Sequence, residues 1–201
     1  MIKNIVFDLG NVLIRFEPKK YLLNFCEGDV LERVYKVIFE SQEWSMLDRG
    51  TITEEEAIER FCRVSDEDSH IIKKAMANWH DILVPIDETV KILKKLKEKG
   101  FKLFVLSNYH KKAFEYTVKK NDFFSLFDGM VISCDINFVK PERQIYEHLL
   151  NKFNLNPKET LFIDDLDENL EGAKILGINT IKFTDANQLL EELNNFNINL
   201  D

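Results

Sequence analysis

From about residue 85 to the C-terminal region, short apolar runs alternate with amphipathic segments, and this alternation constrains the fold more than any other feature. The spacing of apolar residues predicts helices over residues 88–99, 110–120, 141–153, 168–176 and 186–195. Strand-length apolar runs lie at residues 101–106, 129–133, 161–164 and 180–183. Gly100 and Gly177 follow two of the helices, where glycine commonly ends a helix. The pattern predicts an α/β fold with a parallel sheet between two layers of helices.

The first part of the chain has a different pattern. An apolar run at residues 5–7 precedes Asp8 and predicts one more strand of the same sheet. Residues 16–82 contain no clear strand, and Thr53 with Glu56 forms a capping box at the start of a helix. We therefore expect a Rossmann-like three-layer core of residues 1–15 and 83–201, with a helical cap of residues 16–82 inserted at the ligand-binding edge, placed to act as a lid.

Composition excludes several classes of function. The net charge of −8 argues against a nucleic-acid partner, which would need a basic surface. No apolar run is long enough to span a bilayer, and the N-terminus lacks the pattern of a signal peptide. Cys26, Cys62 and Cys134 are scattered without metal-binding spacing, which favours a reduced, cytoplasmic protein. The sequence leaves the oligomeric state open.

Carboxylates stand at the ends of two predicted strands. Asp8 follows the first run, and Asp164 and Asp165 end the run near residue 164. The carboxyl ends of parallel strands share one edge of a sheet, so neighbouring strands would bring the three carboxylates together. Such a cluster repels itself unless a cation neutralises it, and oxygen ligands suit Mg²⁺. The alternative is that Asp8 caps a turn and the Asp pair begins a helix, where acids are favoured.

Three further residues complete a set with a known chemistry. Ser107 and Asn108 follow the second predicted strand, and Lys140 precedes Pro141. A carboxylate nucleophile, hydroxyl and amide donors, a lysine and a metal site are what phosphoryl transfer through an aspartyl-phosphate requires. Taken alone, Ser-Asn is only a turn signal, so the assignment depends on the whole set.

These four motifs, in order and spacing, resemble the haloacid dehalogenase-like hydrolase superfamily over essentially the whole chain, in the branch with a helical cap. The opening Phe-Asp-Leu-Gly-Asn-Val-Leu at residues 7–13 is similar to that of bacterial phosphatases acting on glucose 1-phosphate. The resemblance implies a nucleophile, Asp8, a stabilising cation, Lys140, and two phosphoryl-binding residues, Ser107 and Asn108. It also implies Mg²⁺ ligands: Asp8, the Gly10 carbonyl, Asp164 and Asp165, of which Asp165 is the firmer. Asn169 would orient them.

One position departs from the pattern of these phosphatases. Most carry a second aspartate two residues after the nucleophile, which protonates the leaving group, and here that position is Gly10. Such acid–base help is worth roughly a hundredfold to ten-thousandfold. The chain is then a slow phosphatase, or takes its acid from Asn11, the cap or the substrate, or has lost catalysis. Asn11 tolerates a positive φ, so we expect the turn itself to survive.

Residues near 44–50 are expected to form a loop of the cap that reaches the active site. Arg49 could bind a phosphate or hydroxyl group, and Trp44 could stack on a sugar face, although an ordinary turn with a core tryptophan explains the same residues. His110 is expected to begin a helix, and a part in catalysis is the alternative that we rank lower.

The function hypothesis is a Mg²⁺-dependent phosphatase of a small phosphorylated metabolite, with a sugar phosphate as one candidate. A metal-independent 2-haloacid dehalogenase is the first alternative, because those enzymes also lack the second aspartate. We rank it lower because Asp164 and Asp165 together would be costly without a metal. A catalytically silent module that binds a phosphorylated ligand is the second alternative, and Gly10 keeps it open.

Overall fold

A single parallel sheet forms the centre of the molecule. The computed structural model describes residues 1–200. Five strands lie in the order β5-β4-β1-β6-β7, and all neighbouring pairs are parallel: β1 (Asn4–Phe7), β4 (Lys102–Ser107), β5 (Gly129–Ile132), β6 (Thr160–Asp164) and β7 (Asn179–Lys182). The predicted α/β fold is confirmed, and β1 occupies the central position between the strands that precede Asn108 and Asp165.

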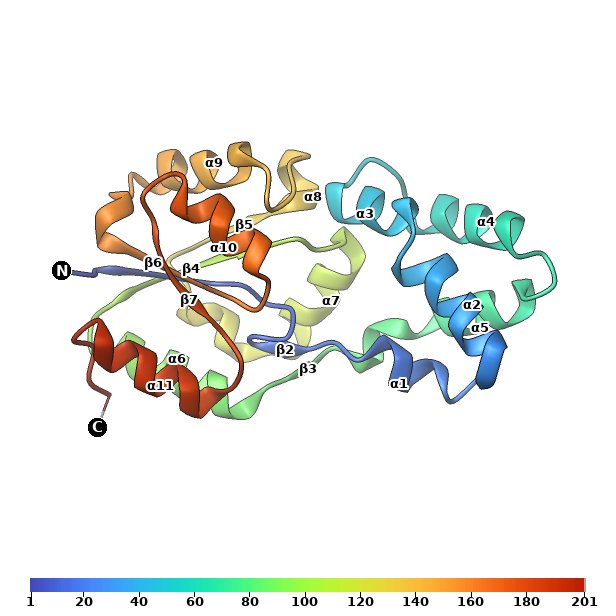
Figure 1. Cartoon of the computed structure of the whole chain (residues 1–201), viewed down its shortest axis with the longest axis horizontal. Helices are drawn as coiled ribbons and strands as arrows, with labels where there is room; N and C mark the ends of the chain where they lie inside the picture. The colour runs from blue at the N-terminus through green and yellow to red at the C-terminus, as the bar shows by residue number, and fades with distance from the viewer. Residues whose placement is uncertain (201) are drawn as a thin grey trace.

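Helices cover both faces of the sheet (Figure 1). Ile5 and Phe7 of β1 belong to one apolar cluster, whereas Val6 belongs to another, because successive side chains of a strand point to opposite faces. The first cluster includes side chains from three helices: α6 (Asp87–Glu98), α7 (Lys111–Lys120) and α11 (Ala186–Asn195). The second includes side chains from α9 (Arg143–Phe153) and α10 (Asp167–Lys174). All four residues of β1 are buried, as expected for a central parallel strand.

The remaining helices form a separate block beside the sheet's carboxyl edge (Figure 1). It consists of α1 (Pro18–Leu22), α2 (Gly28–Phe39), α3 (Gln42–Arg49), α4 (Glu54–Val64), α5 (Ser69–Ala77) and the 3₁₀ turn η1 (Trp79–Ile82). The capping box predicted at Thr53 and Glu56 is present, with both reciprocal hydrogen bonds. Shorter elements of the core are α8 (Ser133–Ile136), η2 (Asp122–Leu126) and η3 (Pro157–Glu159).

The expectation of a loop at residues 44–50 is wrong. The hydroxyl of Ser41 accepts a hydrogen bond from the Trp44 N–H, so a helix, α3, begins there. Gly50 ends it with a left-handed φ of 72°. The sequence Asp48-Arg49-Gly50, interpreted as a turn, is therefore the last turn of a helix and its C-terminal cap.

A short antiparallel ribbon joins the core to the helical block. β2 (Ile14–Arg15) pairs with β3 (Val84–Pro85), so the chain enters and leaves the block through adjacent segments. The Ile86 N–H also donates to the Leu13 carbonyl at 2.8 Å. We propose that residues 16–82 act as the cap predicted from the sequence, with this ribbon at its base.

The C-terminal end of α3 is fastened to the core next to α8. The guanidinium of Arg49 donates to both carboxylate oxygens of Glu142 at 2.6 and 3.0 Å, and to the Asn137 carbonyl at 3.0 Å. The Asn137 amide donates in return to the Arg49 carbonyl at 2.8 Å. A Cβ added to Gly50 would lie 2.5 Å from the Cys134 carbonyl oxygen, which no real Cβ tolerates. The cap and core therefore meet backbone to backbone at this point.

None of the helices among residues 1–200 is long and apolar enough to cross a membrane.

Gly50→Ala tests the close contact between Gly50 and the Cys134 backbone, and Gly100→Ala is its matched control. Both glycines follow helices and have positive φ, at 72° and 87°, but a Cβ at Gly100 would meet nothing within 4 Å. Both substitutions lose the conformational freedom of glycine, whereas only Gly50→Ala forces the cap away from Cys134. We expect Gly50→Ala to lower the free energy of unfolding by about 1–3 kcal/mol more than Gly100→Ala, measured by urea unfolding. Equal losses would contradict the close contact.

Candidate active site

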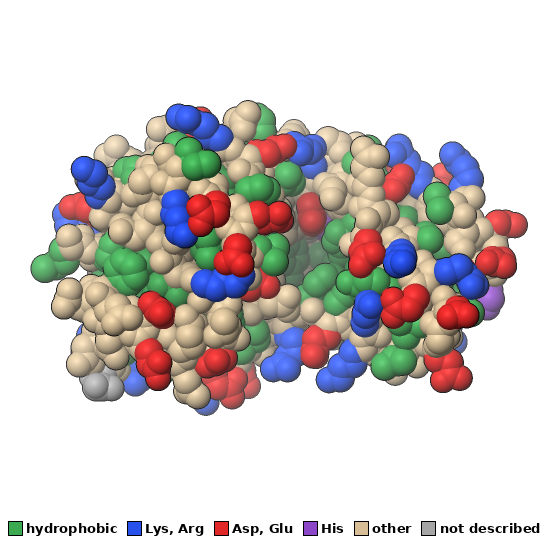
Figure 2. All heavy atoms as spheres, viewed as in Figure 1, with side chains coloured by type: hydrophobic (Ala, Val, Ile, Leu, Met, Phe, Trp, Pro, Cys, Tyr) green, Lys and Arg blue, Asp and Glu red, His purple; other side chains and the backbone are tan. Residues whose placement is uncertain are grey.

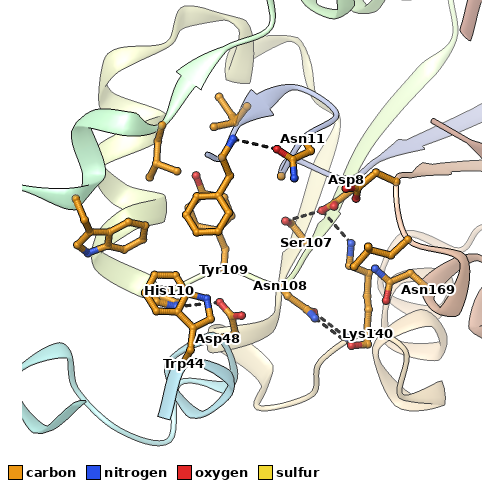
Figure 3. A pocket seen from close by; sticks show the side chains of 17 residues that line it. Asp8, Asn11, Trp44, Asp48, Ser107, Asn108, Tyr109, His110, Lys140 and Asn169 are labelled. Atoms are coloured by element: carbon orange, nitrogen blue, oxygen red, sulfur yellow. Dashed lines mark hydrogen bonds and ion pairs between the residues drawn. The ribbon is translucent and has the colours of Figure 1, made fainter. Parts of the chain in front are cut away.

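A cavity of about 270 Å³ lies at the carboxyl edge of the sheet, between the core and the helical block. Figure 2 shows the hollow between the two halves of the molecule, and Figure 3 shows the side chains around it. Polar residues from the ends of β1, β4 and β6 line one part. The opposite part is apolar and is formed mainly by Ile14, Phe16, Trp44, Trp79 and Leu83. The cavity therefore has a charged end and an apolar wall.

Lys140 connects two buried carboxylates at the charged end. Its Nζ lies 2.9 Å from Oδ1 of Asp8 and 2.6 Å from Oδ2 of Asp164. The Ser107 hydroxyl also donates to Asp8 Oδ1, at 2.7 Å. Asp8 follows β1 directly, with its N–H bonded to the Ile163 carbonyl at 2.9 Å, so the sheet itself places the carboxylate. The sequence prediction that these motifs converge agrees with this geometry.

Burial dominates the electrostatics of Asp8. Desolvation raises the pKa of its carboxyl to about 7, Lys140 opposes this, and Asp164 adds to it. Burial alone would lower the pKa of Lys140, but the two neighbouring carboxylates raise it. The lysine alone does not fully compensate for the buried negative charges.

Asp164 and Asp165 have different environments although they are adjacent. Asp164 is fully buried and accepts hydrogen bonds from the Asn169 amide at 3.0 and 3.1 Å and from the Leu166 N–H at 2.8 Å. Asn169 therefore orients Asp164, as the resemblance implied. Asp165 is half-buried and lines the cavity, and burial and the nearby Asp164 raise the pKa of its carboxyl. Of the two, only Asp165 is among the residues that line the cavity.

The acidic residues fit a divalent cation. One carboxylate oxygen each from Asp8, Asp164 and Asp165 lies within 4.8 Å of the others. Three carboxylates face a single lysine, and hard oxygen donors are what Mg²⁺ prefers. Gly10 also lines the cavity, so its carbonyl remains the predicted fourth ligand.

Asn108 is engaged with the loop that carries Lys140. Its Oδ1 accepts from the Lys140 N–H at 2.7 Å, and its Nδ2 donates to the Lys140 carbonyl at 3.0 Å. This double hydrogen bond holds the lysine backbone against the end of β4. A carboxamide has two donor hydrogens, so one remains for a phosphoryl oxygen. Asn108 still lines the cavity.

The turn after Asp8 has the shape that the sequence predicted. Asn11 has a positive φ of 53°, and its Oδ1 accepts from the Phe16 N–H at 3.0 Å. The Asn11 side chain also acts to lower the pKa of the Asp165 carboxyl, so its predicted contact with substrate competes with these structural roles. At Gly10 an added Cβ would meet nothing within 4 Å, so crowding around the Cβ does not explain why the aspartate is absent here.

Two predicted cap residues have different positions. Trp44 lines the cavity and stacks on Phe16, with ring centroids 5.9 Å apart. Arg49 is not among the residues that line the cavity, and its guanidinium is paired with Glu142. The structure therefore gives Arg49 a place in the contact between cap and core, not beside the substrate.

Sequence reasoning missed several contributors to the cavity, among them most of its apolar wall, and underrated one more. Trp79, in η1, and Tyr109, after β4, both line it. His110 is the N-terminal cap residue of α7, as expected, but it also lines the cavity beside Asp48. The position of Tyr109 and His110 directly after Ser107-Asn108 at a strand end was the signal that could have identified them.

The comparisons with known proteins agree with the fold. Residues 5–183 match the haloacid dehalogenase-like hydrolase family, so the chain belongs to that family and is a hydrolase. It is 25% identical to the sesquiterpene phosphatase astK of Aspergillus oryzae, with 92% of this chain and 91% of that protein aligned. Several other curated relatives are longer, and the chain spans 36%, 18% and 12% of three of them.

Solved structures give the same result. A family enzyme of Bacteroides thetaiotaomicron, BT-2542, in complex with magnesium and inorganic phosphate, is 25% identical with a TM-score of 0.69, covering 92% of this chain and 95% of that one. L-2-haloacid dehalogenase of Xanthobacter autotrophicus shares the fold, with 20% identity, a TM-score of 0.67 and coverage of 98% and 84%.

The raised pKa of Asp8 predicts how stability depends on pH without metal. The unfolded carboxyl titrates near 3.8 and the folded one near 7, so between these values the folded state retains a proton that the unfolded state releases. This contribution to stability is therefore complete below the lower pKa and is lost as pH rises through the upper one. Each unit of raised pKa corresponds to about 1.4 kcal/mol.

Urea unfolding of wild type and Asp8→Asn, with a chelator and from pH 4 to pH 7, measures this effect. Because asparagine does not titrate, we expect the stability of Asp8→Asn relative to wild type to rise by a few kcal/mol over that range. A difference that does not change with pH would contradict the buried, proton-retaining carboxyl.

Proposed function

We propose that this hydrolase is a Mg²⁺-dependent phosphatase that releases phosphate from a small phosphorylated metabolite through an aspartyl-phosphate on Asp8. The observation that carries the proposal is the convergence of Asp8, Lys140 and the two further aspartates at one end of a cavity. A buried carboxylate nucleophile beside a fixed cation is suited to attack on an electrophilic phosphorus that brings negative charge.

Each residue of the charged end has a defined part in the reaction. An oxygen of Asp8 attacks phosphorus, and the bond from phosphorus to the leaving oxygen breaks. Lys140, held 2.9 Å from Asp8 Oδ1, stabilises the negative charge that spreads over the phosphoryl oxygens. Ser107 and the remaining donor of Asn108 orient that group, and water then hydrolyses the acyl-phosphate and restores the carboxylate.

The metal would be held by Asp8, Asp165 and the Gly10 carbonyl, with Asp164 close behind them. A Mg²⁺ ion at this place would neutralise charge on the phosphoryl group and on the carboxylates around it. The similarity to BT-2542, solved with magnesium and phosphate, and to the phosphatase astK supports this proposal.

The apolar wall bears on the substrate. Trp44 and Phe16 offer flat aromatic surfaces opposite the charged end, which suits a phosphate ester whose other part is a sugar face or an apolar group. A sugar phosphate thus remains a candidate. A cytoplasmic location remains a prediction that rests on the unpaired cysteines.

A 2-haloacid dehalogenase is the second candidate, favoured by Gly10 and by the fold shared with L-2-haloacid dehalogenase. The acidic cluster disfavours it, because a reaction at carbon without metal gives Asp165 no partner for its charge. Release of halide from 2-haloacids without magnesium would favour this candidate over the phosphatase.

Asp8→Asn tests the nucleophile. An amide oxygen is a poor nucleophile, so we expect Mg²⁺-dependent phosphate release from a panel of phosphate esters to fall by about a thousandfold or more. The variant should keep the far-ultraviolet circular dichroism of wild type, because asparagine has almost the same volume. Retained turnover would exclude the aspartyl-phosphate. If wild type is also inactive but binds phosphate esters, the silent module is the better interpretation.

Magnesium should stabilise the folded protein, because only the folded state assembles the three carboxylates. At a hundred times its dissociation constant, a ligand adds about 2.7 kcal/mol to the free energy of unfolding. We expect Asp165→Asn to lose most of the rise in melting temperature that MgCl₂ produces. Asp167→Asn is the matched control, since Asp167 is exposed and pairs with Lys182 at 3.0 Å. Equal responses in both variants would contradict a site at Asp165.

A further inference from the structure

The proposed function leaves one step without a group to perform it. An alkoxide is a poor leaving group unless it receives a proton, and Gly10 cannot supply one. Some other side chain must carry that proton, and its assignment rests on the proposed function. The candidates are the titratable residues that line the cavity: Asp8, Asp48, Tyr109, His110, Lys140 and Asp165.

Most of these side chains already have another partner or role in the site. Lys140 is held between Asp8 and Asp164, whose charges keep it protonated. Asp165 faces the metal site. The Tyr109 hydroxyl is hydrogen-bonded to Thr117 at 3.1 Å, and burial raises its pKa, so it retains its proton. Asp48 and His110 remain.

Asp48 and His110 form a pair across the boundary between cap and core. Nε2 of His110, at the start of α7, lies 3.2 Å from Oδ1 of Asp48, in α3 (Figure 3). The histidine side chain is only 4% exposed. Both ring nitrogens are buried, and neither has a hydrogen bond of good geometry among residues 1–200, so the imidazole is an unpartnered polar group in the wall of the cavity.

The surroundings hold both members of the pair in place. The imidazole packs against Trp44 and Trp79, with ring centroids 4.3 and 5.2 Å away. The Ser133 hydroxyl donates to the Asp48 carbonyl, and its oxygen accepts from the Tyr109 N–H at 2.9 Å. One buried serine thus fixes the backbone next to both residues. A group needs such positioning to act as an acid, because proton transfer depends on geometry before acidity.

We propose that the Asp48–His110 pair supplies the proton that the leaving group needs, in place of the aspartate absent at Gly10. As Asp8 attacks phosphorus and the ester bond breaks, the leaving oxygen takes a proton from the imidazolium of His110, and the alcohol departs. The neutral imidazole then takes a proton from the water that attacks the acyl-phosphate, so the cycle ends with Asp8 and His110 as they began. Asp48 is a positioning residue that orients the ring and balances its charge.

The pair has members from both the cap and the core, so it exists only when the cap is closed over the cavity. Protonation of the leaving group is then coupled to closure, and an open site would transfer phosphoryl groups slowly. An aspartate at position 10 would not give this coupling, because it would lie on the core in both the open and the closed state of the cap.

The test compares two kinds of leaving group. 4-Nitrophenyl phosphate releases a stable anion that needs no proton, whereas 2-phenylethyl phosphate releases an alkoxide that does. We expect His110→Gln to lower kcat/KM for the alkyl ester by about a hundredfold to ten-thousandfold, and for the aryl ester by less than about tenfold. Asp48→Asn keeps the side-chain size and the backbone carbonyl bonded by Ser133. It should lower the ratio of kcat/KM for the alkyl ester to kcat/KM for the aryl ester by less than His110→Gln does.

His80→Gln is the matched control. His80 also stacks on Trp79, lies 3.3 Å from the carboxylate of Glu54 and has a buried Nε2 without a hydrogen bond, but it does not line the cavity. It should leave the ratio of the two esters unchanged. Melting temperatures of all variants separate folding from catalysis, and if His110→Gln does not fold, Asp48→Asn decides the question alone.

The outcomes separate the inference from the proposed function. If wild type hydrolyses both esters and the variants lose both equally, or lose neither, the pair is not the acid, although the phosphatase remains. If wild type hydrolyses only the aryl ester, its leaving groups go unprotonated and the pair is again excluded. If wild type releases no phosphate that depends on Asp8, the proposed function fails and the inference fails with it.

Discussion

The contact on which the site depends is that of one buried ammonium group with two buried carboxylates. Lys140 bridges Asp8 and Asp164 across the ends of two neighbouring strands, β1 and β6. Removing such charges from water is costly, and the geometry must be good to compensate. Asn108 and Asn169 maintain this geometry. Asn108 forms two hydrogen bonds with the backbone of Lys140, and Asn169 orients Asp164. The polar groups of the site are thus held by one another before any ligand arrives.

The central position of β1 explains why these groups can meet. A strand with neighbours on both sides brings its own end next to the ends of both, so Asp8 contacts Ser107 on one side and approaches Asp164 on the other. The helical block then closes the opposite side with aromatic surfaces. The cavity combines a charged end, built on the sheet, with an apolar wall that comes mainly from the inserted segment, and the proposed function assigns the chemistry to the first and substrate choice to the second.

Sequence patterns predicted the features that strand order dictates and failed where two distant surfaces dock. The gathering of Asp8, Ser107 and Asp165 could be predicted because parallel strands must end at one edge. Lys140 follows β5 only after α8 and a loop, and its place in the site was predicted from the whole set of motifs. The pairing of Arg49 with Glu142 could not, since those residues are 93 positions apart and neither pattern indicates the other. The contact of His110 with Asp48 could not be predicted either, because it depends on how the cap rests on the core, although the position of His110 after a strand end indicated that it lies near the site. The last turn of α3 was mistaken for a loop because its closing glycine looks the same in both.

The two-stranded ribbon restricts how the molecule can move. Since β2 and β3 are paired with each other, the two crossings of the chain cannot slide apart, and the simplest motion left is a swing about a single axis. That axis begins within a few residues of Asp8: the Asn11 N–H donates to the Ile14 carbonyl at 2.7 Å, and the Asn11 side chain accepts from the Phe16 N–H. The ribbon strand β2 and the turn that follows Asp8 are consecutive parts of the same backbone. A rotation of the helical block about the ribbon would therefore also displace the turn that follows Asp8, so the position of this carboxylate is coupled to the position of the helical block.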